Sequence, residues 1–290
     1  MTKKDIVLHL RFPFSLFLMP IYWLAISQQL NGDFVNNFWI FVILHIFIYP
    51  ASNAFNSYFD KDEGSIGGLK NPPKVDIKLW YAANIFDAVG VLASILIIGP
   101  WFGILVLFYV SVSRLYSHPS VRLKKYPVLS WLIVGSFQGA LVFLMVYTFG
   151  QNLTITDFLE AKNLSSIPIW LGSLLSALIL WAVYPITQVY QHEEDTKNGD
   201  KTMSILLGVR GTFIFCMIFF LLALICSFYF LEQNDFIRFL GFSLPIAIFM
   251  NWWFLTVWKN PAEANFKYTM ILNLMASLLL NFCFIINTLM

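Results

Sequence analysis

Hydrophobic residues along the chain form nine long runs separated by shorter polar segments. The runs lie at approximately 12–30, 37–59, 80–98, 101–116, 127–149, 167–189, 211–231, 237–257 and 268–288. Most are close to the ~20 residues that a helix needs to cross the hydrocarbon core of a bilayer. They show no alternation of period two, and a lipid-exposed sheet edge would leave backbone groups unpaired. The pattern therefore predicts an all-α polytopic membrane protein with about nine transmembrane helices in one bundle.

Composition supports this interpretation, because 59% of the residues are hydrophobic and only 12% are charged. Soluble domains contain about one quarter charged residues. The apolar runs are spread evenly, so residues 1–290 are predicted to form a single transmembrane domain. The net charge of +2 gives no indication of a nucleic-acid partner, and no protein partner is inferred.

The distribution of lysine and arginine predicts how the chain is oriented. Cytosolic loops of membrane proteins carry an excess of these residues. Sixteen of them fall in or beside the N-terminal segment and the loops after the second, fourth, sixth and eighth runs: Lys3, Lys4, Arg11, Lys61, Lys70, Lys74, Lys78, Arg114, Arg122, Lys124, Lys125, Lys197, Lys201, Arg210, Lys259 and Lys267. Only Lys162 and Arg238 fall on the other side. We therefore expect a cytoplasmic N-terminus and an external C-terminus, in the inner membrane if the source is bacterial.

The end of the second run carries a first set of candidate functional residues. Asn53, Asn56 and Asp60 are spaced by three and four residues, so they share one face of a helix. Such residues can simply be solvated among lipid headgroups. However, Asn53 and Asn56 precede the loop, at a depth where polar groups are costly and are usually functional.

The end of the sixth run repeats this geometry, because Gln191 and Asp195 stand four residues apart. The carboxylates in this segment are Glu193, Glu194, Asp195 and Asp200. They would repel one another unless cations neutralise them. Lys197 and Lys201 could do so as a surface network, whereas a divalent metal would do so better. Mg²⁺ binds a few carboxylates, keeps several waters and takes further ligands from substrate phosphates.

The loop after the fourth run supplies positive charge, and its residues are candidates for binding a diphosphate. An ordinary cluster of cytosolic basic residues is the alternative. Arginine offers phosphate a planar fork, and lysine offers it a point charge. The candidates for the diphosphate are Tyr116, Ser117, Arg122, Lys124 and Lys125, together with Lys70 from the first acidic loop.

Three segments resemble the motifs of the UbiA prenyltransferase superfamily. Asn56-Ser-Tyr-Phe-Asp60 resembles its first aspartate-rich motif, NxxxDxxxD, and the stretch from Tyr116 to Lys124 is similar to its YSxPxRxK loop. The stretch from Gln191 to Asp195, continuing to Gly-Asp-Lys-Thr, resembles its second motif. The resemblance implies a nine-helix fold and an Mg²⁺-dependent transfer of a prenyl group from a prenyl diphosphate to an aromatic or other lipophilic acceptor. It implies metal binding by Asn56, Asp60, Gln191, Glu194 and Asp195, with Asp60 and Asp195 essential for catalysis.

Two positions depart from the family pattern. Gly64 and Gln191 stand where the motifs usually have aspartate. These departures leave open a changed metal count, unusual substrates or a family member that has lost activity. A non-catalytic or transport protein is a further alternative, which would favour charged residues inside broken spans.

Four more residues are candidates without a specific chemical role. Asn53, Asp87 and Asn251 are predicted to line the cavity, because polar residues inside spans usually face the bundle interior. Arg11, at the start of the first run, is expected to reach either the lipid headgroups or the diphosphate.

Overall fold

The computed structural model describes residues 1–153 and 168–290, and these contain nine helical spans that are long and apolar enough to cross a membrane. The spans are Lys3–Ser27, Phe34–Asp60, Ile77–Ile98, Pro100–Ser117, Pro127–Phe149, Ile169–Gln188, Met203–Phe230, Gln233–Lys259 and Phe266–Leu289. The predicted fold class is therefore confirmed. The short fourth span, which contains Arg114, is among them. Lys162 lies outside the described residues.

Short 3₁₀ and π segments divide several spans into more than one element. In chain order the elements are α1 Lys3–Leu10, η1 Phe12–Phe17, α2 Met19–Ser27, α3 Phe34–Val42, η2 Ile43–Ile48, α4 Tyr49–Asp60, α5 Ile77–Ala93, η3 Ser94–Ile98, α6 Pro100–Ser117, η4 Leu123–Lys125, α7 Pro127–Ile133, η5 Val134–Leu141, α8 Val142–Phe149, α10 Pro168–Val183, η6 Pro185–Gln188, α11 His192–Lys197, α12 Met203–Phe230, α13 Gln233–Lys259, η7 Pro261–Glu263 and α14 Phe266–Leu289.

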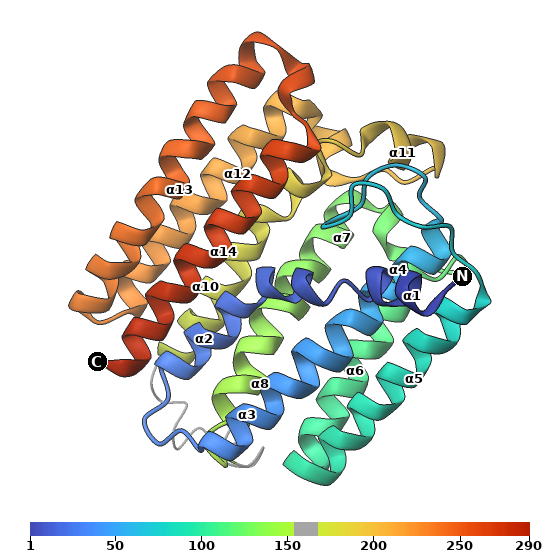
Figure 1. Ribbon diagram of the computed structural model, residues 1–290. Helices are drawn as coiled ribbons and strands as arrows, with labels where there is room; N and C mark the ends of the chain where they lie inside the picture. Colours follow the sequence, from blue (N-terminus) through green and yellow to red (C-terminus); the bar gives the residue numbers. More distant parts are fainter. Residues whose placement is uncertain (154–167) are drawn as a thin grey trace.

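The helices lie side by side, and the segments with polar motifs gather at one end of the bundle (Figure 1). This end carries α11, the loop after α4 and the start of α7, whereas the C-terminus lies at the opposite end. We call it the loop end. Large apolar side chains on the outer helices are exposed, including Ile85, Leu96, Leu107, Phe228, Leu244 and Leu255. So much exposed apolar surface is suited to lipid and not to water.

The first span, predicted at approximately residues 12–30, runs from Lys3 to Ser27 and contains a break after Arg11. Arg11 adopts a left-handed conformation with φ 49° and ends α1, and the 3₁₀ segment η1 follows it. α1 packs against α4 and α5, whereas α2 packs against α8 and α14. The segment η1 therefore crosses between two groups of helices (Figure 1), and this crossing forms one wall of the internal cavity.

Two further features distinguish the spans from simple helices. The π segments η2, η3 and η5 widen the second, third and fifth spans locally, and such turns often occur at functional sites. The α12 helix begins at Met203, before the predicted residue 211, and is interrupted at Gly208, whose φ is 67°. Glycine adopts this left-handed conformation without steric cost, so it allows the sharp change of direction.

Close packing of η5 against α10 depends on a second glycine. A Cβ added to Gly139 would lie 2.6 Å from the carbonyl oxygen of Ser176, far inside van der Waals contact. Glycine therefore lets the two helix backbones approach, as small residues commonly do between membrane helices. This approach fixes the position of Gln138, the neighbouring residue of η5, which lines the cavity.

Candidate functional site

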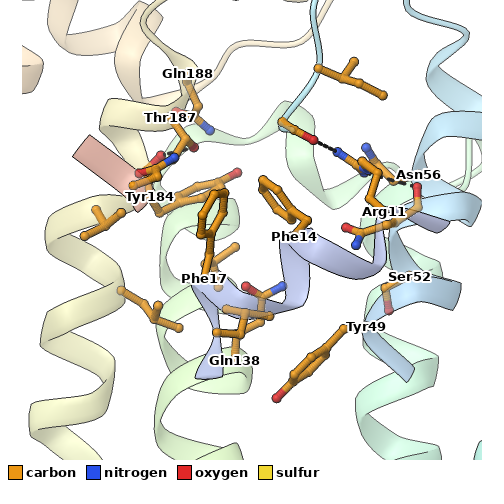
Figure 2. Close-up of a pocket in the computed structure, with 18 of the residues that line it drawn as sticks. Arg11, Phe14, Phe17, Tyr49, Ser52, Asn56, Gln138, Tyr184, Thr187 and Gln188 are labelled. Atoms are coloured by element: carbon orange, nitrogen blue, oxygen red, sulfur yellow. Dashed lines mark hydrogen bonds between the residues drawn. The ribbon is translucent and has the colours of Figure 1, made fainter. Parts of the chain in front are cut away.

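The bundle encloses a cavity of about 300 Å³ that extends from the loop end into the helices. Its walls come from η1, α4, α6, η5, α10, η6, α11 and α14. Figure 2 shows Phe14 and Phe17 of η1 projecting into it, between Tyr184 on one side and Arg11 and Asn56 on the other. Eight of the predicted site residues line the cavity: Asn53, Asn56, Asp60, Tyr116, Ser117, Lys124, Gln191 and Asp195.

Two acidic and two basic side chains form a closed ionic network at the loop end. Lys124 Nζ lies 2.5 Å from Asp60 Oδ1 and 3.1 Å from Asp200 Oδ2. Arg122 donates through Nε and Nη2 to the two oxygens of Asp200 at 2.7 and 2.8 Å, and its Nη2 lies 3.5 Å from Asp60 Oδ1. Asp60 is buried at the end of α4, so this network brings the first acidic motif and the basic loop together.

The carboxylates of the network decide the charge of the buried lysine. Burial lowers the pKa of the Lys124 ammonium, but the carboxylates of Asp60 and Asp200 outweigh burial and hold that pKa above its ordinary value. Lys124 therefore stays positively charged at neutral pH. In this arrangement the four charges cancel, with each cation already in contact with anions of the protein.

Asp195, in contrast, has no such partner. It lines the cavity from α11, and its Oδ2 atom is buried without a hydrogen-bond partner among the described residues. Burial raises the pKa of the Asp195 carboxyl to about 7, with repulsion from Asp200 and Asp62 adding to burial and nearby Lys124 opposing it. The nearby Lys197 pairs instead with exposed Glu193 at 2.8 Å. The lysine of α11 therefore does not neutralise the carboxylate that faces the cavity.

The two acidic loops contact each other directly through polar groups. The backbone N–H of Glu63 donates to Glu194 Oε1 at 3.2 Å, and Gln191 Nε2 donates to the carbonyl oxygen of Ser65 at 3.3 Å. Asn198 Nδ2 also donates to Asp62 Oδ1 at 3.2 Å. Burial raises the pKa of Asp62 to about 6, and repulsion from Asp60 adds to this.

The remaining neutral candidates are held by hydrogen bonds between helices. Asn56 Oδ1 accepts from the Ser117 hydroxyl at 2.8 Å, which joins α4 to α6. The hydroxyl groups of Tyr116 and Tyr184 hydrogen-bond each other across the cavity wall. These bonds keep the Asn56 amide beside Asp60, as the sequence spacing predicts.

Besides Asn251, which is described below, five predicted residues lie outside the cavity lining. Lys125 Nζ lies 5.0 Å from the centroid of the Tyr126 ring. Adjacent residues of the 3₁₀ turn η4 point in different directions, so Lys125 does not follow Lys124 into the cavity. Lys70 is exposed. Glu194 contacts the loop that follows α4. Arg122 contacts Asp60 and Asp200, which line the cavity, but does not line it itself. Asp87 pairs with Arg114 between α5 and α6.

The prediction that Asn251 lines the cavity is wrong. Its side chain is exposed on α13, and its Nδ2 atom donates to the Ala247 carbonyl at 2.8 Å, one turn earlier in the same helix. This bond to the helix's own backbone satisfies the amide without any interior partner. A polar residue in a span need not face the bundle.

Several cavity residues were not predicted from the sequence. Arg11, for which two roles were open, lines the cavity and donates to the carbonyls of Gly67 and Asn53 at 3.0 and 3.3 Å. Tyr49, Gln138 and Asn273 also line the cavity.

A divalent metal can be tested against this set of side chains. Within residues 1–153 and 168–290, no group of three His, Cys, Asp or Glu side chains is arranged to hold a metal ion by itself. The Oδ2 atom of Asp195, which has no hydrogen-bond partner among the described residues, and the buried carboxylate of Asp60 nevertheless fit a hard cation. Such a cation would take its remaining ligands from water and phosphate, as Mg²⁺ commonly does.

Fold and site together define a polytopic membrane protein whose cavity is charged at one end and mainly apolar beyond it. The chain belongs to the UbiA prenyltransferase family, whose family model matches residues 16–276. This confirms the resemblance seen in the motifs. A comparison with curated protein sequences gives no match.

Solved structures show the same fold at low sequence identity. A UbiA homologue from Archaeoglobus fulgidus bound to DMAPP and Mg²⁺ is 16% identical with a TM-score of 0.67, and the match covers 99% of this chain and 100% of that chain. An apo UbiA homologue from Aeropyrum pernix K1 is 15% identical with a TM-score of 0.69, covering 95% and 98%. Digeranylgeranylglyceryl phosphate synthase is 19% identical with a TM-score of 0.61, covering 98% of both chains.

Proposed function

We propose that the protein is an intramembrane prenyltransferase that moves a prenyl group from a prenyl diphosphate to a lipophilic acceptor, with Mg²⁺ as cofactor. The observation that carries this proposal is the convergence of Asp60, Asp195 and Lys124 on one cavity whose deeper walls are mainly apolar. A diphosphate head needs metal ligands and cations, whereas a prenyl tail needs apolar walls. Family membership and the A. fulgidus homologues bound to GPP or DMAPP with Mg²⁺ support the same reaction class.

The residues of the chain would have distinct roles in this reaction. Asp60 and Asp195 would hold Mg²⁺ from two helices, with Asn56 and Gln191 as neutral neighbours that also line the cavity. The metal would neutralise charge on the diphosphate as the allylic C–O bond breaks. Lys124 and Arg122 would donate to the departing diphosphate oxygens, where negative charge increases in the transition state.

The remaining step is attack by the acceptor. The bond between the acceptor nucleophile and the allylic carbon forms as the electron pair of the C–O bond leaves with the diphosphate, and the acceptor then loses a proton. Phe14 and Phe17 of η1 project into the cavity (Figure 2), where their rings exclude water and can stabilise positive charge on the allylic carbon.

A transport protein and an inactive family member are the alternatives. Charged residues inside spans would favour transport, but Asp87 and Arg114 neutralise each other away from the cavity lining. Loss of activity would not require Asp60, Asp195, Arg122 and Lys124 to stay assembled at the loop end. We also propose that the loop end is cytoplasmic, because nearly all basic residues belong to it.

The test is release of diphosphate by the purified protein with isoprenyl diphosphates, candidate acceptors and varied Mg²⁺. We expect Asp60→Asn and Asp195→Asn each to reduce turnover nearly completely while the protein stays folded, because each removes an anionic metal ligand. Glu193→Gln is the matched control, since this carboxylate lies in the same helix as Asp195 but is exposed and pairs with Lys197. Wild-type rates with unchanged Mg²⁺ dependence in both aspartate variants would refute the proposal.

A further inference from the structure

A second, smaller cavity lies between the fourth and fifth spans, beside the main cavity. Its volume is about 50 Å³, and we call it the side pocket. Val112 of α6, Ile133 of α7 and Phe137 of η5 line the side pocket and not the main cavity. The other lining residues are shared by both: Tyr109, Ser113, Tyr116, Val134 and Gln138. The two spaces therefore adjoin, with side chains of the same two spans at their boundary.

The packing of these spans explains why a space remains between them. α6 packs against η4 at the loop end, and at the opposite end the rings of Phe102 and Phe149 lie with their centroids 5.4 Å apart. Between these ends, α7 and η5 pack mainly against α12 and α10. Counted from the loop end of each helix, Val112 lies roughly 8 Å deep in α6 and Ile133 roughly 9 Å deep in α7. The two residues therefore lie at one level on either side of the gap.

The side pocket also borders the surface that faces lipid. Phe108 of α6 is 53% exposed, and its ring centroid lies 5.3 Å from that of Phe137, which lines the pocket. Leu132, the neighbour of Ile133, is 39% exposed. The pocket thus lies between the main cavity and the lipid-facing surface, and apolar side chains close its outer side. Exposed side chains change rotamer within nanoseconds, so they do not form a fixed wall.

We propose that the tail of the prenyl diphosphate leaves the main cavity through the side pocket, between α6 and the α7–η5 segment, and continues into the bilayer. This inference rests on the proposed prenyl transfer and assigns the path that its substrate takes. A tail that ends in lipid meets no closed floor, so the protein accepts long prenyl chains as well as short ones.

The position of the charged residues gives the tail this direction. Arg122 and Lys124 lie in the short connection between α6 and α7, at the loop end of the gap between these two helices. A diphosphate that contacts Lys124 therefore has the side pocket directly below it in the membrane. The described residues that line the side pocket include no charged one. An isoprenoid chain can enter such a space, whereas burial of the diphosphate there would be very costly.

Other spans around the main cavity leave less room for a chain. α14 packs along α2, and α10 packs along η5 and α12. At Gly139 the backbones of η5 and α10 approach so closely that a Cβ would lie 2.6 Å from the Ser176 carbonyl oxygen. A tail that passed there would have to separate helix backbones. Between α6 and η5 it needs only side chains to move.

The test compares dimethylallyl and geranylgeranyl thiodiphosphate, which carry a short and a long tail and whose carbon–sulfur bond resists cleavage. Binding of each to the purified protein with Mg²⁺ is measured by calorimetry. Ile133→Trp and Val112→Trp fill the side pocket, so each should weaken binding of the long probe about tenfold or more and leave the short probe unchanged. Leu132→Trp is the matched control, because it adds the same bulk to an adjacent position that faces lipid.

Equal effects on both probes, or no effect on either, would overturn the inference, as would a wild-type protein that binds only the short probe. Failure of the wild-type protein to bind either probe would instead contradict the proposed transferase function. A photolabel then locates the tail directly. Geranylgeranyl thiodiphosphate with a diazirine at the end of its chain should label α6, α7 or η5 on irradiation, and absence of label from all three would overturn the assigned path.

Discussion

The ionic network at the loop end leads to a prediction in which two ligands respond in opposite directions. Lys124 Nζ lies 2.5 Å from Asp60 Oδ1, so the lysine stands where a metal bound to Asp60 would lie, and Asp60 stands where a phosphate bound to Lys124 would lie. Binding of a metal–diphosphate complex must therefore exchange these contacts. Lys124→Gln removes the cation from this exchange.

The expected magnitudes follow from the contacts that are lost. Lys124→Gln changes the charge of the four-residue network from zero to −1, which leaves Asp60 free for a cation. We expect Mn²⁺, as a probe for Mg²⁺, to bind the substrate-free variant about tenfold more tightly. A prenyl thiodiphosphate should bind more weakly by roughly 1.5–3 kcal/mol, or about ten- to hundredfold, because one charge-assisted hydrogen bond is lost.

The assay is titration of detergent-solubilised protein, with Mn²⁺ detected by electron paramagnetic resonance and the thiodiphosphate by calorimetry. Lys125→Gln is the control, because it removes the same charge from the adjacent position without touching the cavity lining. A general effect of positive charge would change both variants alike. If Lys124→Gln weakens both ligands, or neither, then Lys124 does not compete with the metal for Asp60.

Three other predictions test the diphosphate contact, the packing and the topology. Arg122→Ala should weaken thiodiphosphate binding about ten- to hundredfold in a folded protein, and unchanged affinity would leave Arg122 an ordinary basic loop residue. Gly139→Ala should destabilise the bundle by about 1–3 kcal/mol in thermal unfolding, whereas Gly241→Ala, with open space around its Cβ position, should not. Reporters placed at the loop end should read cytosolic, and detection of any two on opposite sides would refute the topology; the positions are Lys70, Lys125, Lys197 and Lys259.

Run lengths were sufficient to predict the spans, because bilayer thickness imposes one length on every helix that crosses it. The same constraint made the assembly of the site predictable. Spans that alternate in direction bring the ends of the second and sixth helices to one face, so Asp60 and Asp195 had to lie at the same depth. Their position in a common cavity then follows from helix packing, which the structure supplies.

Rotation of each helix about its axis was not predictable. A span that is apolar on every side has little amphipathic signal, so an amide on its surface gives no direction. Asn251 and Asn273 illustrate this, because each lies in an apolar span but only Asn273 lines the cavity. The break at Arg11 was equally hidden, since a left-handed arginine has no signature beyond the Pro13 that follows it.

The two departures from the family motifs are linked by the contacts between the acidic loops. A Cβ on Gly64 would lie 3.3 Å from Glu194 Oε2, so the Glu194 carboxylate borders the space that an aspartate side chain would enter. Gln191 donates to the Ser65 carbonyl, the residue after Gly64, which an aspartate carboxylate could not do. An aspartate at position 64 would place a second anion beside the Glu194 carboxylate. An aspartate at position 191 would leave the Ser65 carbonyl without its donor. The two substitutions therefore reduce the negative charge at the cavity mouth and allow direct hydrogen bonding between the loops, and Asp60, Asp62, Asp195 and Asp200 remain as the acidic residues that line the cavity.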